Sequence, residues 1–529
     1  MTLSIHTLHD SAARICLIAV FVIAHSGCQS VSSWWHNCRM VGPNYCEPVA
    51  PVADEYQDTE SPMIDSSVTA DVRWWHVFDD VELDQLIEQV YQQNLSLKAA
   101  AWRIAESRLQ RNIAAANLFP QRQTAFGQFA HTQNSLNTAT AFPGFPLTID
   151  DWSVGFDASW EIDLWGRIRR GVRAADAQWA ASIRDYDFAL VTLIGDVASL
   201  YIQIRSLDER LRLASTNVNL QQGSLDIAQK RFDEGRTSKL DVVQAESNLA
   251  ATKSLIPQLE LARRQSSNAL AVLLGIPPGQ SQDLVSSVGS IPNVPNQLMV
   301  GIPAELVTRR PDIRSAERLM AAQFEQIGIA EADLYPTFAF SGTLGYQAAR
   351  FSDLFDSSSF TGTAAPGFRW NILNYGRLRN NIRVQEARVN QIQFDFQNQV
   401  LAAQREVEDA IAEFIKTSEQ YEFESDNAAA NREAVRLALT SYKEGKDDFG
   451  RVFVVQTNLV TAQDRLVATK AAIALAVVKT YKALGGGWQI RCEGSAPSSD
   501  SIVVSNESVP NNDTINAQPP LPQDEETAE

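Results

Sequence analysis

A single design, a short alternating strand followed by a long heptad helix, occurs twice in this chain. Residues 152–163 alternate strictly between apolar and polar side chains, which predicts a strand with one apolar and one wet face. After a turn at 164–167, apolar residues recur in steps of three and four, as in a coiled coil. This first seam consists of Leu190, Leu193, Val197, Leu200, Ile204, Leu207 and Leu211. The turn returns at 375–379, and a second seam follows at Val400, Ala403, Val407, Ala410, Phe414, Thr417 and Tyr421. The duplication predicts one architecture built from two halves.

Composition and motifs narrow the function. The 529 residues carry a formal charge of −18, which argues against nucleic acid as a partner. The cysteines show no CxxC spacing, and all six histidines lie at or before His131. HExxH, GxSxG and GxxxxGK motifs are absent as well, so an exported hydrolase finds no support. We therefore predict a protein that is not an enzyme, with no catalytic residues, metal ligands or cofactor.

The amino terminus has the pattern of an export signal. Arg14 precedes the apolar run 15–24, which is too short to span a bilayer but suits a signal-peptide core. Small residues before Cys28 resemble a bacterial lipoprotein cleavage box, which would make Cys28 the lipidated, palmitate-bearing first residue. His25 stands where that box favours an aliphatic residue, so ordinary cleavage with an unmodified Cys28 stays open. Gln29 resembles the signal for sorting to the outer membrane.

The remaining turn and loop signals divide the chain into segments. A loop is predicted at 134–150, and Pro366 predicts an irregular or edge position for the last strand. Each repeat carries a hairpin of long helices, with turns near Gly235 and Gly445. The predicted order is a signal peptide (1–27), an extended segment (28–73), a first repeat (74–278) with strands 124–132 and 152–163, a linker (279–303), a second repeat (304–488) with strands 337–346 and 360–372, and a disordered acidic tail (489–529).

Strands of about ten residues with an aromatic face match the height of a bilayer when tilted. Four strands cannot close, and an open edge in lipid leaves backbone groups unsatisfied. Because the smallest membrane barrels have about eight strands, several chains would have to share one barrel. The alternative is two soluble hairpins packed on the helices. Helices of about 60 residues extend on the order of 90 Å, which fits either a tube or a plain coiled-coil stalk.

The start of the second repeat carries a specific signature, Leu306-x-x-Arg309-Arg310-Pro311-Asp312-Ile313. Asp163-Leu-Trp-Gly-Arg167 and Val41-Gly-Pro-Asn-Tyr45 support it. The chain thus resembles the TolC-type outer-membrane efflux proteins, in their lipoprotein branch. The resemblance implies a mainly helical fold with a membrane β-barrel portion: a homotrimer with one twelve-stranded barrel continuing into a periplasmic α-helical tunnel (α-barrel).

The resemblance also implies a function. Such a trimer passively conducts small molecules (drugs, toxic compounds or metal ions) out of the cell, as the exit duct of a tripartite efflux system. Its partners would be a periplasmic adaptor (membrane fusion) protein, an inner-membrane pump of the RND or ABC type, and outer-membrane lipid of a Gram-negative bacterium. The alternative is a periplasmic or secreted coiled-coil scaffold without a pore. The sequence identifies neither the cargo, the pump nor the ion selectivity.

Site residues follow from the same resemblance. Gly235 and Gly445 would contact the adaptor, and Asp241, Asp447 and Asp448 would lie near a periplasmic gate. Nearby cations are available to pair with the gate carboxylates, each exposed pair contributing about 0–1 kcal/mol. These cations are Arg236, Lys239, Lys443, Lys446 and Arg451. The signature residues Arg309, Arg310, Pro311 and Asp312 are predicted to be structural. Whether Cys46 and Cys492 form a disulfide stays open.

Overall fold

The protein is represented by a computed structural model that describes residues 34–35, 37–67, 72–135, 137, 147–286 and 289–493. Contacts divide the chain into a large unit ending at Gln489 and a small unit beginning at Ile490. The described part of the small unit is the short helix α11 (Ile490–Glu493). The predicted signal peptide, Cys28 and most of the predicted tail lie outside the described residues.

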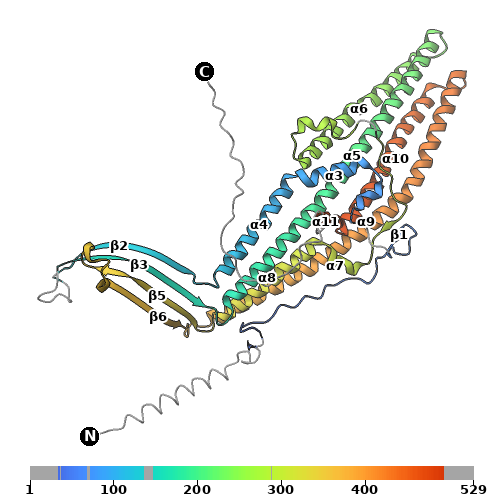
Figure 1. Ribbon diagram of the computed structural model, residues 1–529. Helices are drawn as coiled ribbons and strands as arrows, with labels where there is room; N and C mark the ends of the chain where they lie inside the picture. The colour runs from blue at the N-terminus through green and yellow to red at the C-terminus, as the bar shows by residue number, and fades with distance from the viewer. Residues whose placement is uncertain are drawn as a thin grey trace, which may run out of the picture. The chain divides into compact units, whose positions relative to one another are not determined.

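Two long helical hairpins dominate the large unit (Figure 1). Each first arm begins after a left-handed glycine, Gly166 with φ 85° and Gly376 with φ 83°, a conformation that side chains with a Cβ disfavour. The first repeat contains the 3₁₀ helix η1 (Trp74–Phe78), α3 (Val81–Gln93), α4 (Leu95–Ala116), α5 (Arg167–Asp233) and α6 (Lys239–Leu274). The second contains α7 (Leu306–Arg309), α8 (Pro311–Ala332), α9 (Arg377–Glu444) and α10 (Phe449–Ala483). Between the repeats lie η2 (Pro278–Asp283) and η3 (Pro303–Glu305).

The heptad seams form the cores of α5 and α9. Leu190, Val197 and Ile204 are fully buried, as are Val400 and Val407. At 67 residues and ~1.5 Å per residue, α5 extends about 100 Å, so it needs neighbours along its whole length. One stretch of α5 is apolar enough to cross a membrane, but 61% of it is buried within the protein, as in a core helix.

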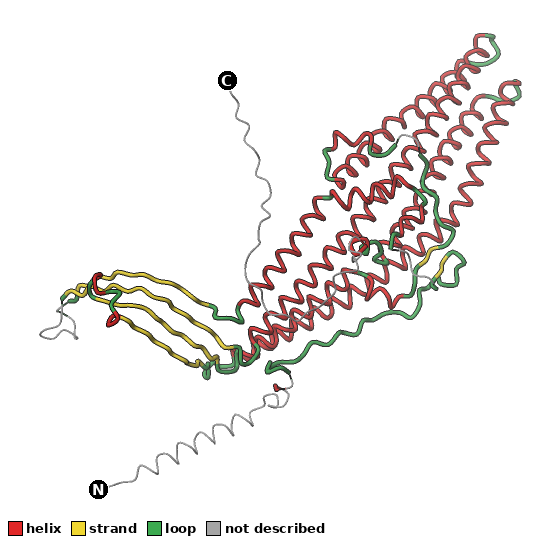
Figure 2. Tube along the Cα trace, viewed as in Figure 1, coloured by secondary structure: helices red, strands yellow, loops and turns green. Residues whose placement is uncertain are grey.

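A four-stranded antiparallel sheet lies at one end of the helices (Figure 2). Its order is β2 (Arg122–Gln133), β3 (Thr148–Ile162), β5 (Thr337–Ala348) and β6 (Phe360–Arg369). The β3–β5 ladder joins the two repeats. β6 is an edge strand, as Pro366 requires. The prediction of a mainly helical chain with two repeats and four strands is therefore confirmed.

Two strand boundaries differ from the prediction by three residues or more. β3 begins at Thr148, inside the predicted loop 134–150, because the ladder with β2 continues as far as the Gln133–Thr148 pair. β6 ends at Arg369 rather than at 372. The next residue, Trp370, contacts the segment before β5 instead: its Nε1 donates a hydrogen bond to Leu334 O at 2.9 Å.

Residues 40–67 form an extended segment along the helices, here called the N-terminal strap (Figure 1). Its beginning is bound by Arg170 of α5, which is fully buried and donates hydrogen bonds to Val41 O and Gly42 O. Its end forms the strand β1 (Ile64–Asp65), which pairs in parallel with β4 (Leu298–Met299). Cys46, within the strap, is an exposed free thiol.

Candidate functional site

The free ends of the two helical hairpins form the first part of the candidate site. The α5–α6 turn contains Gly235 with φ 69°, and the α9–α10 turn contains Gly445 with φ 78°. A Cβ added at Gly235 would meet nothing within 4 Å, so the left-handed backbone, and not packing, requires glycine there. Both turns close in the same way, with Arg236 N donating to Arg231 O and Lys446 N donating to Ser441 O.

A buried carboxyl group links these two turns. Asp241, at the start of α6, is 8% exposed and accepts hydrogen bonds from the Thr237 hydroxyl and, at 3.1 Å, from the Tyr442 hydroxyl of α9. Arg231 of α5 also reaches α9: its guanidinium lies 4.6 Å from the centre of the Tyr442 ring and donates to Tyr442 O. Four side chains thus bind one hairpin to the other, and we call them the tip network (Arg231, Thr237, Asp241 and Tyr442).

The hydroxyl group of Tyr442 stays protonated at neutral pH. Burial raises the pKa of Tyr442, and the nearby Asp241 carboxylate raises it further, against an opposing effect of the Thr237 hydroxyl. The phenol therefore remains a hydrogen-bond donor.

An apolar cluster that includes Tyr442 adjoins the tip network. All four long helices contribute to it: Ala228, Val242, Ala245, Ala438, Tyr442, Phe449 and Val452.

A ladder of buried amides continues the contact between the hairpins. Gln456 of α10 accepts a hydrogen bond from Asn248 Nδ2 at 3.0 Å and donates to the Ser224 hydroxyl at 2.7 Å. Asn217 Nδ2 donates to Gln463 Oε1 at 2.8 Å. These bonds are directional and shielded from water, so the hairpins are held in one register.

The other predicted gate carboxylates lie at the surface. Asp448 caps α10, accepting from Arg451 N at 3.2 Å, and Asp447 pairs with the Arg451 guanidinium at 3.4 Å. The remaining cations that form ion pairs here bind glutamates instead: Arg236 pairs with Glu234, and Lys446 with Glu444. Sequence reasoning missed Arg231, Thr237 and Tyr442. The position of Arg231 and Tyr442, three or four residues before each turn glycine, was the available signal.

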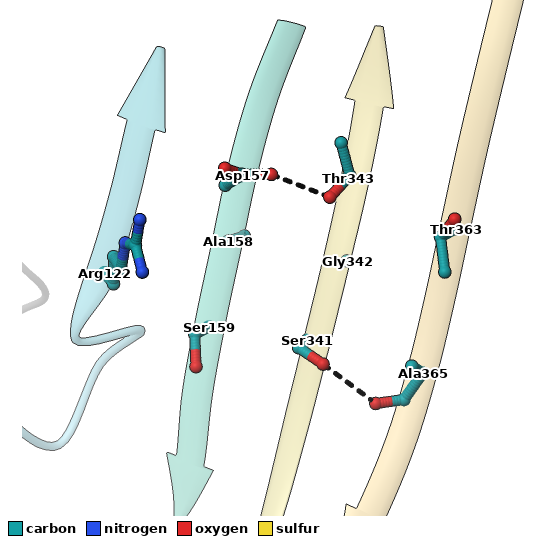
Figure 3. A pocket seen from close by; sticks show the side chains of 9 residues that line it. All are labelled: Arg122, Asp157, Ala158, Ser159, Ser341, Gly342, Thr343, Thr363 and Ala365. Carbon is teal, nitrogen blue, oxygen red and sulfur yellow. Dashed lines mark hydrogen bonds between the residues drawn. The ribbon is translucent and has the colours of Figure 1, made fainter. Parts of the chain in front are cut away.

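The sheet is the second part of the site, and its two faces differ. One face is apolar and is exposed in the single chain: Phe156 is 69% exposed, and Leu344, its partner in the β3–β5 ladder, is 59% exposed. The same face carries Phe129, Trp160, Phe340, Phe360 and Phe368. The opposite face is polar (Figure 3): the Thr343 hydroxyl donates to Asp157 Oδ1 at 2.7 Å, and Ser341 donates to Ala365 O at 3.3 Å. Arg122, Ser159 and Thr363 line the same hollow.

The signature residues join the helices of the second repeat to one another, away from both sites. Arg310 is 6% exposed; its guanidinium binds both carboxylate oxygens of Asp312, Glu406 of α9 at 2.7 Å, and Ala483 O at the end of α10. Burial alone would raise the pKa of Asp312, but the Arg310 hydrogen bonds hold it below its ordinary value. Pro311 occupies the first turn of α8, where its missing N–H is not needed. The structural role of these residues stays a prediction. No cluster that could hold a metal ion occurs among the described residues.

Comparison with known proteins decides the family. The protein-family model described as “Outer membrane efflux protein” matches residues 86–276 and 302–486, which is more than half of the chain and includes both repeats. The chain belongs to this family. It is 33% identical over 424 residues to the pyoverdine export outer membrane protein OpmQ of Pseudomonas putida, covering 79% of this chain and 89% of the relative.

A second relative of this outer membrane efflux protein has another cargo in its name. The toluene efflux pump outer membrane protein TtgC of Pseudomonas putida is 27% identical over 458 residues, 85% of this chain and 93% of the relative. The solved structure of the outer-membrane channel OprN superposes with a TM-score of 0.79 at 31% identity, covering 85% of this chain and 99% of that one. The predicted family, outer-membrane location and role as an efflux exit duct are confirmed.

Proposed function

We propose that three copies of this efflux protein share one twelve-stranded barrel in the outer membrane, and that their helical hairpins form a periplasmic tunnel closed at the tips. A periplasmic adaptor protein contacts the tip turns at Gly235 and Gly445. An inner-membrane pump delivers small molecules into the tunnel, which conducts them passively to the outside.

One observation carries this proposal: the sheet has a continuous apolar face and a polar face on a single layer of strands. In a soluble protein the exposed aromatic face would be a liability. In a bilayer it faces lipid, while the polar face with Asp157, Thr343 and Thr363 lines water. Trp160 and Trp370 lie at the end nearest the helices, where tryptophan is favoured by the membrane–water interface.

The edges of the sheet explain why several copies are needed. Within the described residues, β2 and β6 each pair with one neighbour only. Unpaired backbone groups in lipid cost several kcal/mol each. Because the four strands alternate in direction, β6 of one chain runs antiparallel to β2 of the next, so copies can join edge to edge into a closed ring.

The tip network supplies the closure. Buried contacts between Asp241 and Tyr442 hold the two hairpins of each chain together, whereas the exposed Asp447–Arg451 pair contributes little. Binding of an adaptor to the turns can open the tips if it favours separated hairpins. The relatives named for pyoverdine and for toluene indicate that similar ducts serve different cargos, which supports selection of the cargo by the pump.

Charge placed on either face of the sheet tests the barrel. Phe156→Arg puts a cation in lipid, which costs about 2–4 kcal/mol near the bilayer centre. Outer membranes should therefore no longer contain this variant as a trimer that dissociates on heating. Thr343→Arg, one residue away on the adjacent strand but on the polar face, should assemble normally. Equal tolerance of both variants would contradict a lipid-facing aromatic surface.

The lipid anchor is a separate part of the proposal. Acylation of Cys28 would tie the strap to the inner leaflet of the outer membrane. Cells fed an alkyne analogue of palmitate should label the wild-type protein, and Cys28→Ser should abolish the label. Labelling that persists in Cys28→Ser would assign the lipid to another residue and refute the assignment.

A further inference from the structure

One aromatic pair, here called the aromatic joint, connects the two repeats. Among the described residues, the two rings at the corresponding positions on the free edges of the sheet do not stack on another ring. In the aromatic joint, Trp165, just after β3, stacks on Tyr335, just before β5, with ring centres 4.7 Å apart and planes 23° apart. Trp165 Nε1 also donates to Pro336 O at 2.8 Å. The joint lies where β3 of the first repeat pairs with β5 of the second.

The same residues recur at the free edges of the sheet. Tyr375-Gly376-Arg377 follows β6 as Trp165-Gly166-Arg167 follows β3, and Phe119-Pro120 precedes β2 as Tyr335-Pro336 precedes β5. The local structure repeats too, because Trp160 Nε1 donates to Leu118 O and Trp370 Nε1 to Leu334 O. The internal repeat is therefore accurate at the level of single hydrogen bonds.

The two rings at the free edges are both exposed. Tyr375 is 98% exposed and Phe119 is 68% exposed, whereas Trp165 and Tyr335 are partly buried against each other. Tyr375 also has φ 51°, in the left-handed region, which Trp165 does not adopt. β2 and β6 are the outer strands of the sheet, so these two rings belong to opposite edges of one chain.

We propose that Tyr375 of one copy stacks on Phe119 of the next copy, completing between chains the joint that Trp165 and Tyr335 make within a chain. This inference rests on the proposed shared barrel and specifies how its copies meet. The adjoining β6–β2 ladder then repeats the β3–β5 register. The Arg122–Ser159 pair of one ladder corresponds to the Thr337–Arg369 pair of the other, so the first repeat has one extra residue between Pro120 and its strand. Transferring the Trp160–Phe340 pair through these ladders places Trp370 opposite Ala125, and it places Ala365 opposite Ala130.

The transferred register is consistent with the two faces of the sheet. In the observed ladders the apolar face carries the even-numbered residues of β6, including Phe360 and Phe368, and the odd-numbered residues of β2, including Phe129. A register that pairs Trp370 with Ala125 keeps all of these on one face. A slip by a single residue would turn the apolar face of the next copy toward water.

Cross-linking between chains tests the joint. In a background with Cys38, Cys46 and Cys492 changed to serine, the pair Phe119→Cys and Tyr375→Cys should give covalent trimers with a short bis-maleimide. Ala130→Cys with Ala365→Cys should give them by oxidation alone. Ala130→Cys with Thr363→Cys, which is shifted by two positions, should oxidise at least tenfold more slowly.

The outcomes separate this inference from the function on which it rests. Native trimers that form without cross-links at 119 and 375 would overturn the aromatic joint while leaving the shared barrel intact. Faster oxidation of the shifted pair would overturn the register. Absence of any trimer in the wild-type protein would overturn the shared barrel, and the joint with it.

As a second readout, Phe119→Ala and Tyr375→Ala should each lower the temperature at which trimers dissociate, and the double variant should lower it no further than the single ones. Phe355→Ala, at the other end of the sheet, should add its effect independently.

Discussion

Replacing Tyr442 with phenylalanine should open the channel. The variant keeps the ring that packs in the apolar cluster and under Arg231, but it removes the hydroxyl that donates to Asp241 at 3.1 Å. The two hairpins of each chain then lose the hydrogen bond to the carboxylate between their tips, while the bond from Arg231 to Tyr442 O remains. Single-channel conductance in planar bilayers should rise from a low, closed level to a sustained open level.

The expected size follows from the number of copies. A hydrogen bond to a carboxylate contributes about 1.5–3 kcal/mol. Losing one in each of three copies weakens the closed state by about 4.5 kcal/mol or more, about a thousandfold in the ratio of open to closed channels. Exposed pairs such as Asp447–Arg451 contribute about 0–1 kcal/mol, so Arg451→Ala should change conductance far less.

A matched control is available on the same helix. Tyr421 lies on α9, on the heptad seam and outside the tip network, so Tyr421→Phe should leave conductance at the wild-type level. If Tyr442→Phe also remained at that level, the tip network would not be the closure. Cysteines at Thr237 and Tyr442 should lock the wild-type level when oxidised and release it on reduction.

Replacing Arg170 with methionine should produce the largest loss of stability in the chain. Its guanidinium is fully buried, donates to Val41 O and Gly42 O, and pairs with Glu325 at 2.8 Å. Removing one partner of a buried pair costs about 3–5 kcal/mol because the other charge stays buried without compensation. Limited proteolysis should cut the N-terminal strap first, and the midpoint of denaturation should fall.

Two further variants make this test specific. Arg170→Met combined with Glu325→Leu removes both charges and should recover part of the loss, since the remaining cost is the Arg170 hydrogen bonds that Val41 O and Gly42 O lose. Arg405→Met breaks an ion pair with Asp409 whose partners are 72% and 75% exposed, and it should change stability by less than about 1 kcal/mol. A similar loss in Arg405→Met would show that charge, and not burial, determines the effect.

The sequence was most informative where one period extends over many residues. The heptad seams predict α5 and α9, and the strict alternation of 152–163 predicts β3, because a long repeat of apolar positions has only one regular structure that can bury it. Boundaries were less predictable. The ladder between β2 and β3 continues through His131 and Asp150, polar residues that alone favour a loop, because each strand supplies the other with backbone partners.

The tip network could be predicted only in part. Sequence proximity to the turns suggested pairs of opposite charge, but Asp241 is held by hydroxyl groups from Thr237 and from Tyr442, some 200 positions away. The partner of Asp241 is set by how two hairpins pack, and no local pattern records that. The repeat itself could be recognised in the sequence. The role proposed for Phe119 and Tyr375 followed only from the structure, in which the corresponding residues, Tyr335 and Trp165, stack on each other.

Native mass spectrometry of the full-length protein extracted from outer membranes tests the central claim most directly, namely that one chain supplies a third of a barrel. The account predicts a species of three chain masses that dissociates to monomers on heating. A stable monomer with the aromatic sheet face protected from solvent, as measured by hydrogen exchange, would contradict it.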